Sequence, residues 1–475
     1  MRFFNLVDFI YGPLVLIFII IITRSKKYSL VKKFPEYKYY TKGMYVKLAG
    51  GLALCLIYTQ YYGGGDTIGY FQDSMIMVRL LFKNPSGFFS VMINGLDMES
   101  YWAYFDYNIG YPMYYRDPMT FMVVRFTTVL TLLAAGSYIV TTLLFAWFSY
   151  GGVWRLYKVF VAEFPDLKKE MAIAVLFIPS VFFWSSGVLK DTITMSAIGY
   201  YTYAFYQIFI VRDKILGNLF IMFLSVFLIM SIKPYIAFAL LPGSLIWVVN
   251  KFIFSLKNKV IKNMIGPFML VIAIGGGYLI LNSLKGLLGI YSVDQVLERA
   301  VISNQDLKAD YYGGNSFDIG DFDPTVSSML SKAPAAINAA IFRPYLWESR
   351  NIVMLVSGLE SMMLLFLTFR FFIQVRLFGF LKYLTRSHLL AFSLIFSLFF
   401  AFSVGISTSN FGSLVRYRIP VLPFYVASLF IMQYYYKRDR KSDSISEQEE
   451  LEYKFGKTAD QTNPDDSSLT IFEAK

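Results

Sequence analysis

Long runs of apolar residues alternate with short polar stretches along most of the chain. A helix of about 20 apolar residues crosses the hydrocarbon core of a bilayer, and most of these runs come close to that length. The pattern therefore predicts an all-α integral membrane protein with about eleven transmembrane helices. The predicted spans are Leu6–Ile22, Tyr45–Tyr62, Phe126–Phe148, Met171–Val188, Ile193–Ile210, Leu219–Ile232, Ile236–Val249, Met264–Leu281, Ile352–Phe369, Leu389–Ile406 and Ile419–Tyr436.

Basic residues collect in alternate connections between these runs. Short loops rich in lysine and arginine stay in the cytoplasm, so the dense basic loop after the first span predicts an amino terminus outside and a carboxyl terminus inside. No small-residue cleavage site follows the first span, which is interpreted as a retained helix. The basic residues of the first two such loops are Arg24, Lys26, Lys27, Lys32, Lys33, Lys38, Lys42 and Lys47, then Arg155, Lys158, Lys168 and Lys169.

Two long polar segments, about residues 63–124 and 284–351, lie on the external side under this topology. Their short apolar pieces, such as Met75–Phe82 and Gly87–Ile93, do not reach across a bilayer and predict helices that lie in the interface. Residues 437–475 are polar and charged. They predict a disordered cytoplasmic tail that follows a membrane domain of residues 1–436.

Composition narrows the classes of function. Of the 475 residues, 56% are hydrophobic and 16% are charged, too few charges to cover a soluble protein of this size. One cysteine, Cys55, and one histidine, His388, exclude an intrachain disulfide and the cysteine- or histidine-rich metal centres. The net charge is +12, but the cations lie in the loops of a membrane topology, so the sequence predicts no nucleic-acid partner.

The stretch Tyr61–Asp73 directly follows the second span and carries the most specific chemistry. Its three consecutive glycines allow a sharp bend and let a ligand approach the backbone. A carboxylate at the rim of the bilayer, here Asp66, has a tunable proton affinity and suits a general base. Aromatic faces such as those of Tyr70 and Tyr111 stack on sugars. The alternative interpretation is a glycine cap that ends one helix and an Asp that begins the next.

Further charged residues gather on the same predicted external face. Cations there run against the positive-inside bias, and a phosphate ligand would give them a function. Each also has a structural interpretation as a helix cap, a snorkelling lysine or, for Arg343 and Glu348, a bridge to one another. We expect these residues to converge on one outward pocket. The candidate catalytic residues are Asp66, Asp73 and Asp191, and the candidate substrate-binding residues are Tyr70, Tyr111, Lys190, Lys233, Arg343, Trp347, Glu348, Arg416 and Arg418.

Two further acidic features stay open. Glu360 lies inside a predicted span, where a carboxylate either serves function or bonds to another helix. The carboxylates between Asp310 and Asp323 offer oxygen ligands for a divalent cation, but their spacing matches no calcium loop. No metal site is therefore predicted, and the cofactor stays unknown.

The segment Gly65–Tyr70, the hairpin Pro179–Asp191 and the helix entry Arg416–Pro420 resemble bacterial membrane proteins of cell-surface polysaccharide assembly. These include the polytopic glycosyltransferases of the GT-C type, the EpsG-like proteins and the Wzy-type polymerases. In the GT-C group an acidic residue of the first external loop acts as catalytic base, and Asp66 matches its position. Wzy-type polymerases hold pyrophosphate-linked chains with external arginines, which Arg343, Arg416 and Arg418 match. The chain lacks the paired acidic motif of the first group and the arginine loop motif of the second, so the resemblance does not choose between them.

The resemblance implies a glycosyltransferase or polysaccharide polymerase. It would transfer sugar units from a polyprenyl-phosphate-linked donor to a glycan acceptor at the external face of the bacterial cytoplasmic membrane. The implied partners are membrane lipid, the lipid-linked donor, the glycan acceptor and other glycan-assembly proteins. A transporter or flippase for lipid-linked glycans would also gather charges in a membrane cavity, without glycosyl transfer, and is the alternative.

Overall fold

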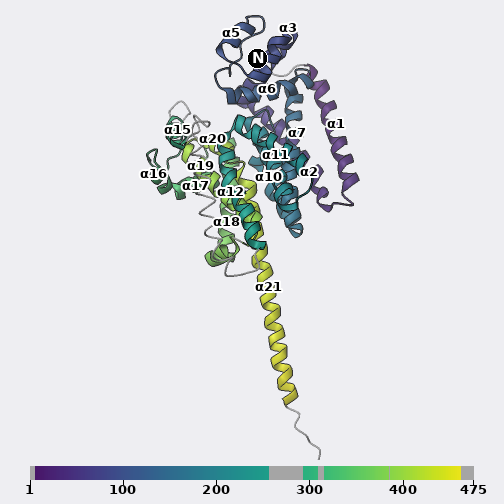
Figure 1. Cartoon of the computed structure of the whole chain (residues 1–475), viewed down its shortest axis with the longest axis vertical. Helices are drawn as coiled ribbons and strands as arrows, with labels where there is room; N and C mark the ends of the chain where they lie inside the picture. The colour runs from purple at the N-terminus through teal and green to yellow at the C-terminus, as the bar shows by residue number, and fades with distance from the viewer. Residues whose placement is uncertain (1–5, 256–292, 309–314, 385, 462–475) are drawn as a thin grey trace, which may run out of the picture.

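The computed structural model describes residues 6–255, 293–308, 315–384 and 386–461. Within these ranges the secondary structure is helical, apart from connecting loops and one isolated β-bridge between Ser316 and Asn410. The predicted all-α class is therefore confirmed. Figure 1 shows an upright helical body from which one long helix, α21, extends downward. The predicted span Met264–Leu281 lies outside the described residues.

Four helices form the core of the first half of the chain: α1 (Leu6–Leu30), α2 (Tyr40–Leu56), α7 (Tyr138–Glu163) and α10 (Lys190–Phe205). Helix α7 packs against the other three. Its closest approach is to α10, where a Cβ added at Gly152 would lie 2.0 Å from the Ser196 carbonyl oxygen. Small residues at a helix crossing let two backbones touch, so these positions hold α7 and α10 in one orientation.

Short helical turns extend or connect these elements. Pi-helical turns continue α2 and α10, and 3₁₀ turns lie in the connections. The turns are Pro35–Tyr39, Ile57–Tyr61, Pro165–Leu167, Tyr206–Val211 and Leu346–Glu348.

The predicted span Phe126–Phe148 is not one straight helix. Helix α6 (Pro118–Leu133) meets α7 at an angle of 111°. Ala135 and Gly136 adopt positive φ values of 50° and 73° in the turn, and the Ser137 side chain caps the first turn of α7. Alanine and glycine are themselves apolar, so the hydropathy pattern did not reveal this break.

The two predicted hairpins differ in regularity. The span Met171–Val188 is divided into two short helices, because Pro179 cannot continue the preceding helix. The second hairpin has two long arms and turns at Lys233, as predicted. The four helices are α8 (Lys168–Leu176), α9 (Pro179–Trp184), α11 (Ile215–Ile232) and α12 (Pro234–Ser255).

Three helices cover the end of the bundle from which α7 begins: α3 (Asp66–Lys83), α4 (Pro85–Asn94) and α5 (Met98–Tyr104). They occupy the first segment predicted to be external and to contain short interfacial helices. Helix α3 is longer than predicted, since it begins at Asp66 rather than near Met75. In Figure 1, α3 and α5 lie at the top of the body, above α6.

The second half packs around α19 and α21. Helices α20 and α21 meet at 61°, with Pro420 in the turn between them. The predicted disordered tail begins at residue 437, yet α21 continues to Gln461 through residues such as glutamate, lysine and glutamine, which favour helices. The helices are α15 (Val293–Asp306), α16 (Val326–Ser331), α17 (Ala333–Phe342), α18 (Ile352–Leu384), α19 (His388–Ser407), α20 (Phe411–Tyr417) and α21 (Val421–Gln461).

Among the described residues, four helices are long and apolar enough to cross a membrane, or six if each of two bent pairs is one span. The chain is therefore a multi-pass membrane protein. The predicted count of about eleven goes beyond these helices, partly because α8 and α9 are each much shorter than a full span, and α2 and α10 reach span length only together with their π-helical turns. The four are Val7–Leu30, Ile215–Ile232, Ile352–Leu384 and His388–Ser407.

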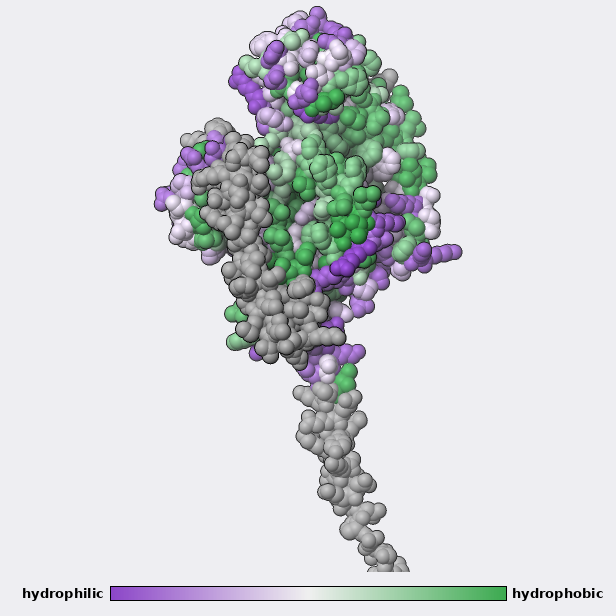
Figure 2. All heavy atoms as spheres, in the orientation of Figure 1, coloured by the Kyte–Doolittle hydropathy of each residue, from purple (hydrophilic) through white to green (hydrophobic). Residues whose placement is uncertain are grey.

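Figure 2 shows hydrophobic residues gathered over the middle of the visible face of the body. Hydrophilic surface borders this zone at the end that carries α3 and α5, and again toward the opposite end. An apolar zone between two polar zones is typical of a surface that faces lipid. It fits the spans identified by helix length.

Candidate functional site

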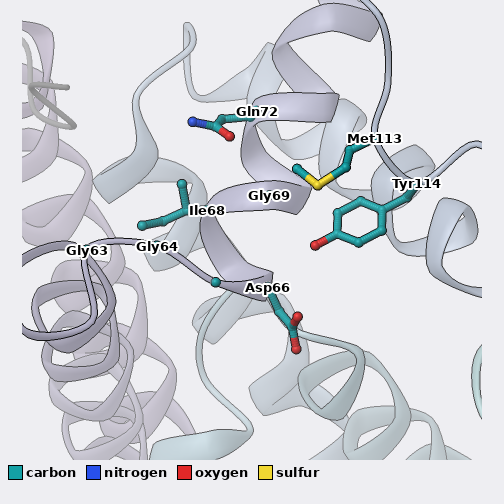
Figure 3. Close-up of a pocket in the computed structure, with 9 residues that line it drawn as sticks. Gly63, Gly64, Asp66, Ile68, Gly69, Gln72, Met113 and Tyr114 are labelled. Atoms are coloured by element: carbon teal, nitrogen blue, oxygen red, sulfur yellow. The ribbon is translucent and has the colours of Figure 1, made fainter. Parts of the chain in front are cut away.

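A pocket of about 620 Å³ lies where α2 gives way to α3. The linker between them has positive φ values of 64° at Gly63 and 111° at Gly65. A Cβ at Gly65 would lie 2.8 Å from the Tyr58 ring, so a larger residue there would clash as well as strain the backbone. In Figure 3 the Tyr114 hydroxyl points toward the first turn of α3, from which the Asp66 carboxylate projects. The lining residues are Gly63, Gly64, Gly65, Asp66, Ile68, Gly69, Gln72, Met113 and Tyr114.

Four charged side chains form a continuous ionic network at the edge of this pocket. The Arg416 guanidinium donates to Asp66 over 3.0 Å through one nitrogen and to Asp191 over 3.4 Å through another. Lys233 Nζ lies 2.5 Å from the other Asp191 oxygen. The order along the network is Asp66, Arg416, Asp191, Lys233. Four predicted site residues from distant parts of the chain therefore lie together.

Three members of the ionic network occupy a helix end that suits their charge, and the fourth, Lys233, lies between the carboxyl end of α11 and the amino end of α12. Asp66 begins α3 and Asp191 lies in the first turn of α10, while Arg416 lies in the last turn of α20 and Lys233 follows the end of α11. Helix amino ends carry partial positive charge and carboxyl ends partial negative charge. For Asp66, Asp191 and Arg416, the backbone dipoles therefore stabilise the same charges that the side chains pair.

Burial increases along the ionic network from Asp66 to Asp191. The exposed fraction of the side chain falls from 42% at Asp66 to 18% at Arg416 and 4% at Asp191. Burial alone would raise the pKa of the Asp191 carboxyl, but the charges of Lys233 and Arg416 outweigh it and hold that pKa below its ordinary value. Asp191 is thus a buried carboxylate kept ionised by two cations. Asp66 is the member that faces the pocket.

Aromatic rings enclose the two cations. The Arg416 guanidinium lies 5.7 Å from the centre of the Trp184 ring, and Lys233 Nζ lies 4.6 Å from that of Tyr417. Cation–π contacts of this kind fix a cation in place while leaving some of its N–H donors for other partners. Trp184 was named at the sequence level only as part of the hairpin Pro179–Asp191.

Lys190 lies next to this network but pairs with different residues. Its ammonium is 3.6 Å from Asp117 and 2.5 Å from the Thr120 hydroxyl. Burial lowers the pKa of Lys190, and the Asp117 carboxylate offsets only part of that effect. Asp117 was not a predicted site residue. Its position in the sequence does carry a signal: an Asp directly before a Pro is typical of the start of a helix, and Asp117 caps α6.

Three other predicted residues do not line the pocket: Asp73 and Tyr70 lie behind its wall, and Tyr111 lies away from it. Asp73 is buried and accepts hydrogen bonds from the backbone N–H groups of Met113 (3.0 Å) and Tyr114 (2.9 Å). Tyr70 is buried with its ring 5.0 Å from that of Tyr114. Tyr111 packs edge-on against Trp102, 5.9 Å away, on the outer surface. Asp73 therefore holds the loop that supplies Met113 and Tyr114.

Arg418 lies in a separate buried cluster. Its guanidinium is fully buried and donates to Glu360 over 3.3 Å and to the Arg343 carbonyl oxygen over 2.6 Å. Glu360 in turn accepts from the backbone N–H and the hydroxyl of Ser180, both at 2.6 Å. This cluster joins α9, α18 and the turn before α21. Glu360 bonds across helices, which is one of the two interpretations the sequence left open.

Arg343, Trp347 and Glu348 form a third group, beside α18. Arg343 makes a salt bridge to Glu348, the structural alternative considered for this pair, and its guanidinium lies 4.7 Å from the Phe317 ring centre. Trp347 stacks on Tyr345 at 4.9 Å and is 81% exposed. The predicted site residues thus fall into three groups, not one pocket.

Lys47 has a role that the sequence analysis missed. It was counted with the lysines of the first basic loop, but the structure buries it in α2, where its Nζ donates to the Ser185 hydroxyl over 3.0 Å and also to the Ser185 carbonyl oxygen. The signal was its position inside the predicted span Tyr45–Tyr62. Lys47 ties α2 to the loop that leads into Lys190 and Asp191.

A metal site is not evident in the part of the chain that the structure describes, because no three His, Cys, Asp or Glu side chains there are grouped to hold an ion. The acidic stretch considered for a cation is described only from residue 315 onward. Within it, Asp318 pairs with Lys308 at 2.7 Å. Asp310, Gly313 and Gly314 lie outside the described residues.

Comparison with protein-family models, with curated proteins and with solved structures finds no match to this chain. No family is therefore assigned, and function has to be argued from the site.

Proposed function

We propose that this protein transfers sugar units from a polyprenyl-phosphate-linked donor to a glycan acceptor at the external face of the membrane. The observation that supports it most is the Arg416 guanidinium, which bridges Asp66 and Asp191 beside a pocket of about 620 Å³. A carboxylate facing the pocket and a cation directly behind it are the two groups that glycosyl transfer from a phosphate donor needs.

The cations supply the phosphate site in this proposal. An Arg fork binds phosphate oxygens in pairs, and lysines add point charges to it. Arg416 presents its fork to two carboxylates, and the helix geometry brings Lys190 and Lys233 to the same region. A donor phosphate that reaches Arg416 competes with Asp66 for the same N–H groups. Phosphate binding therefore releases the Asp66 carboxylate.

The released carboxylate acts as general base. Asp66 accepts the proton of the acceptor hydroxyl as its oxygen attacks the anomeric carbon of the donor sugar. The bond between that carbon and the phosphate oxygen breaks, and the electron pair leaves with the polyprenyl phosphate, whose charge Arg416 stabilises. Donor binding and base activation are thus coupled through one arginine.

The membrane supplies the route for the donor. The polyprenyl tail stays in the bilayer while the head group enters the pocket, which is lined by the glycine linker and the first turns of α3. The Gly63–Gly65 linker leaves room there, since nothing lies within 4 Å of a Cβ added at Gly63 or Gly64. The external orientation rests on the positive-inside pattern of the loops.

The decisive experiment compares glycosyl transfer and translocation in one preparation. Purified protein in proteoliposomes receives a radiolabelled polyprenyl-linked sugar and a glycan acceptor, without ATP. Asp66→Asn is expected to lower the rate of glycosidic bond formation by about 100-fold or more, because it removes the base. Asp97→Asn is the matched control, since Asp97 is exposed and caps α5, a role Asn also fills.

Two results would count against the proposal. Equal transfer by Asp66→Asn and the parent protein would remove the base assignment. Movement of the lipid-linked sugar across the vesicle wall with no new glycosidic bond would favour the transporter class instead.

A further inference from the structure

Three cations gather far along the bundle from the pocket, on α1 and α7. They are Lys26, Arg155 and Lys158. Lys26 and Lys158 both lie close enough to Arg155 for their charges to repel. Like charges are brought together at a cost, so this arrangement calls for a counter-charge.

Aromatic faces hold these cations in place. The Arg155 guanidinium lies 4.6 Å from the Tyr200 ring centre, Lys158 Nζ lies 5.6 Å from that of Tyr203, and Lys26 Nζ lies 5.2 Å from that of Tyr40. No salt bridge involves the three cations within the part of the chain that the structure describes. Glu36 is the carboxylate whose charge acts on Lys158. Three positive charges against one negative leave the cluster cationic.

Helix register places this cluster about one membrane thickness from the ionic network. Asp8 near the start of α1 accepts hydrogen bonds from the Ser137 hydroxyl and from the Ile139 N–H at the start of α7. The sequence separation from Asp8 to Lys26 on α1 equals that from Ser137 to Arg155 on α7. At a rise of 1.5 Å per residue, this separation corresponds to about 27 Å along each helix. The hydrocarbon core of a bilayer is about 30 Å thick.

The same two helices stay side by side over that length. Midway along both, the rings of Phe18 and Trp147 meet at 6.1 Å. The starting end is next to the pocket, since the Tyr138 hydroxyl donates to Thr67, the neighbour of Asp66, over 2.8 Å. The cationic cluster therefore lies at the opposite boundary of the membrane from the pocket.

We propose that the cluster of Lys26, Arg155 and Lys158 binds the phosphate of an anionic phospholipid headgroup from the surrounding bilayer. Cationic pockets at helix ends near a membrane surface attract such headgroups, and tyrosines favour the same interface. The acyl chains would run along the exposed apolar side chains of α1, among them Phe18 and Ile21, and past Phe148 of α7. The lipid would link α1 to α7 and α10 at the membrane boundary opposite the pocket.

Native mass spectrometry of the detergent-purified full chain measures this directly. Phosphatidylglycerol and phosphatidylcholine are titrated separately against the parent protein and against the triple variant Lys26→Gln, Arg155→Gln, Lys158→Gln. We expect the parent to prefer phosphatidylglycerol. The triple variant is expected to bind it on the order of 100-fold more weakly, because each of the three cations that converge on the headgroup phosphate contributes about a factor of five.

The triple variant Lys32→Gln, Lys33→Gln, Lys38→Gln is the matched control, because it removes the same charge from the exposed adjoining loop. It is expected to bind phosphatidylglycerol as the parent does, and melting curves of all three proteins verify folding. Equal loss in both variants, or no loss in the first, would overturn the proposal. Displacement of the lipid by millimolar inorganic phosphate would overturn it too, since it would indicate a site for a free anion.

Discussion

Arg416 and Arg418 stand two residues apart, yet they belong to different parts of the molecule. Arg416 lies at the rim of the pocket and binds the carboxylates of Asp66 and Asp191. Arg418 is fully buried and binds Glu360 and two backbone carbonyl oxygens. The first arginine links helices around a space that can admit a ligand. The second links helices where no space is left.

The difference lies in local backbone geometry. Arg416 is in the last turn of α20, whereas Arg418 is in the turn that precedes α21. A change of 61° in chain direction between the two helices turns their side chains toward different neighbours. Two arginines that look equivalent in the sequence therefore have separate roles, one exchangeable with a ligand and one structural.

Of the substitutions that test this difference between the two arginines, Arg418→Met is expected to have the largest effect, a loss of stability. The substitution leaves the buried Glu360 carboxylate without a cation, and removing one partner of a buried ion pair costs about 3–5 kcal/mol. Thermal unfolding followed by fluorescence in detergent is the measurement. We expect a much lower melting temperature than that of the parent protein.

A double variant, Arg418→Met with Glu360→Met, separates the charge from the packing. Replacing both partners of a buried pair by apolar side chains is often close to neutral. Recovery of most of the lost stability is the expected result. If the double variant is as unstable as the single one, the ion pair is not the reason for the loss.

The second effect concerns activity, at Arg416→Gln. Under the proposed function this variant loses the group that holds the leaving phosphate, so transfer falls by about 100-fold, comparable to the loss of one oxyanion donor. Stability changes less, because Asp191 keeps Lys233 at 2.5 Å and Asp66 is partly exposed to solvent. The transfer assay and the melting curve are measured on the same preparation.

Arg116→Gln provides the matched control for that experiment, since Arg116 is an exposed arginine of the same outer region. It is expected to leave transfer and melting unchanged. A melting temperature for Arg416→Gln as low as that for Arg418→Met would erase the distinction between the two arginines.

The smallest effect is a pH dependence at Asp117. Burial raises the pKa of this carboxyl, but the hydrogen bonds from Thr120 and the charge of Lys190 lower it by more, so the pKa lies below its ordinary value. An acid whose folded-state pKa is depressed contributes stability above its unfolded pKa and loses it as the pH falls through the folded pKa. The contribution is therefore complete above about pH 4 and declines in more acidic solution.

Melting temperatures of the parent and of Asp117→Asn between pH 6 and pH 3 measure that contribution. The two curves are expected to differ at pH 6 and to approach one another toward pH 3, by a small amount because Asp117 is half exposed. A constant difference across this range would show that the charge of Asp117 does not stabilise the fold.

The long apolar helices were predictable because their signal is local. Ile215–Ile232, Ile352–Leu384 and His388–Ser407 contain the predicted spans almost unchanged. Breaks between helices were harder to predict. The turn at Ala135 and Gly136 has only Ser137 as a polar residue to mark it, while Pro179 does mark the break in the span that begins at Met171.

The candidate site was predictable by residue type, but not by partner. The chemistry of their side chains and their places near helix ends mark Asp66 and Arg416 as site residues, but neither property indicates that the two are in contact. Their salt bridge of 3.0 Å joins positions far apart in the sequence. Asp117 and Lys47 received no role, because each acts through a partner supplied by another helix.

Hydropathy alone was enough to establish a helical membrane protein with charged residues collected near the helix ends, since water and lipid sort side chains position by position. The pairing of those charges depended on the tertiary structure, which brings the amino ends of α3 and α10 next to the carboxyl ends of α11 and α20. Electrostatic attraction acts through space and is indifferent to chain order. For that reason only the folded arrangement distinguished the arginine that meets the pocket from the arginine that closes the core.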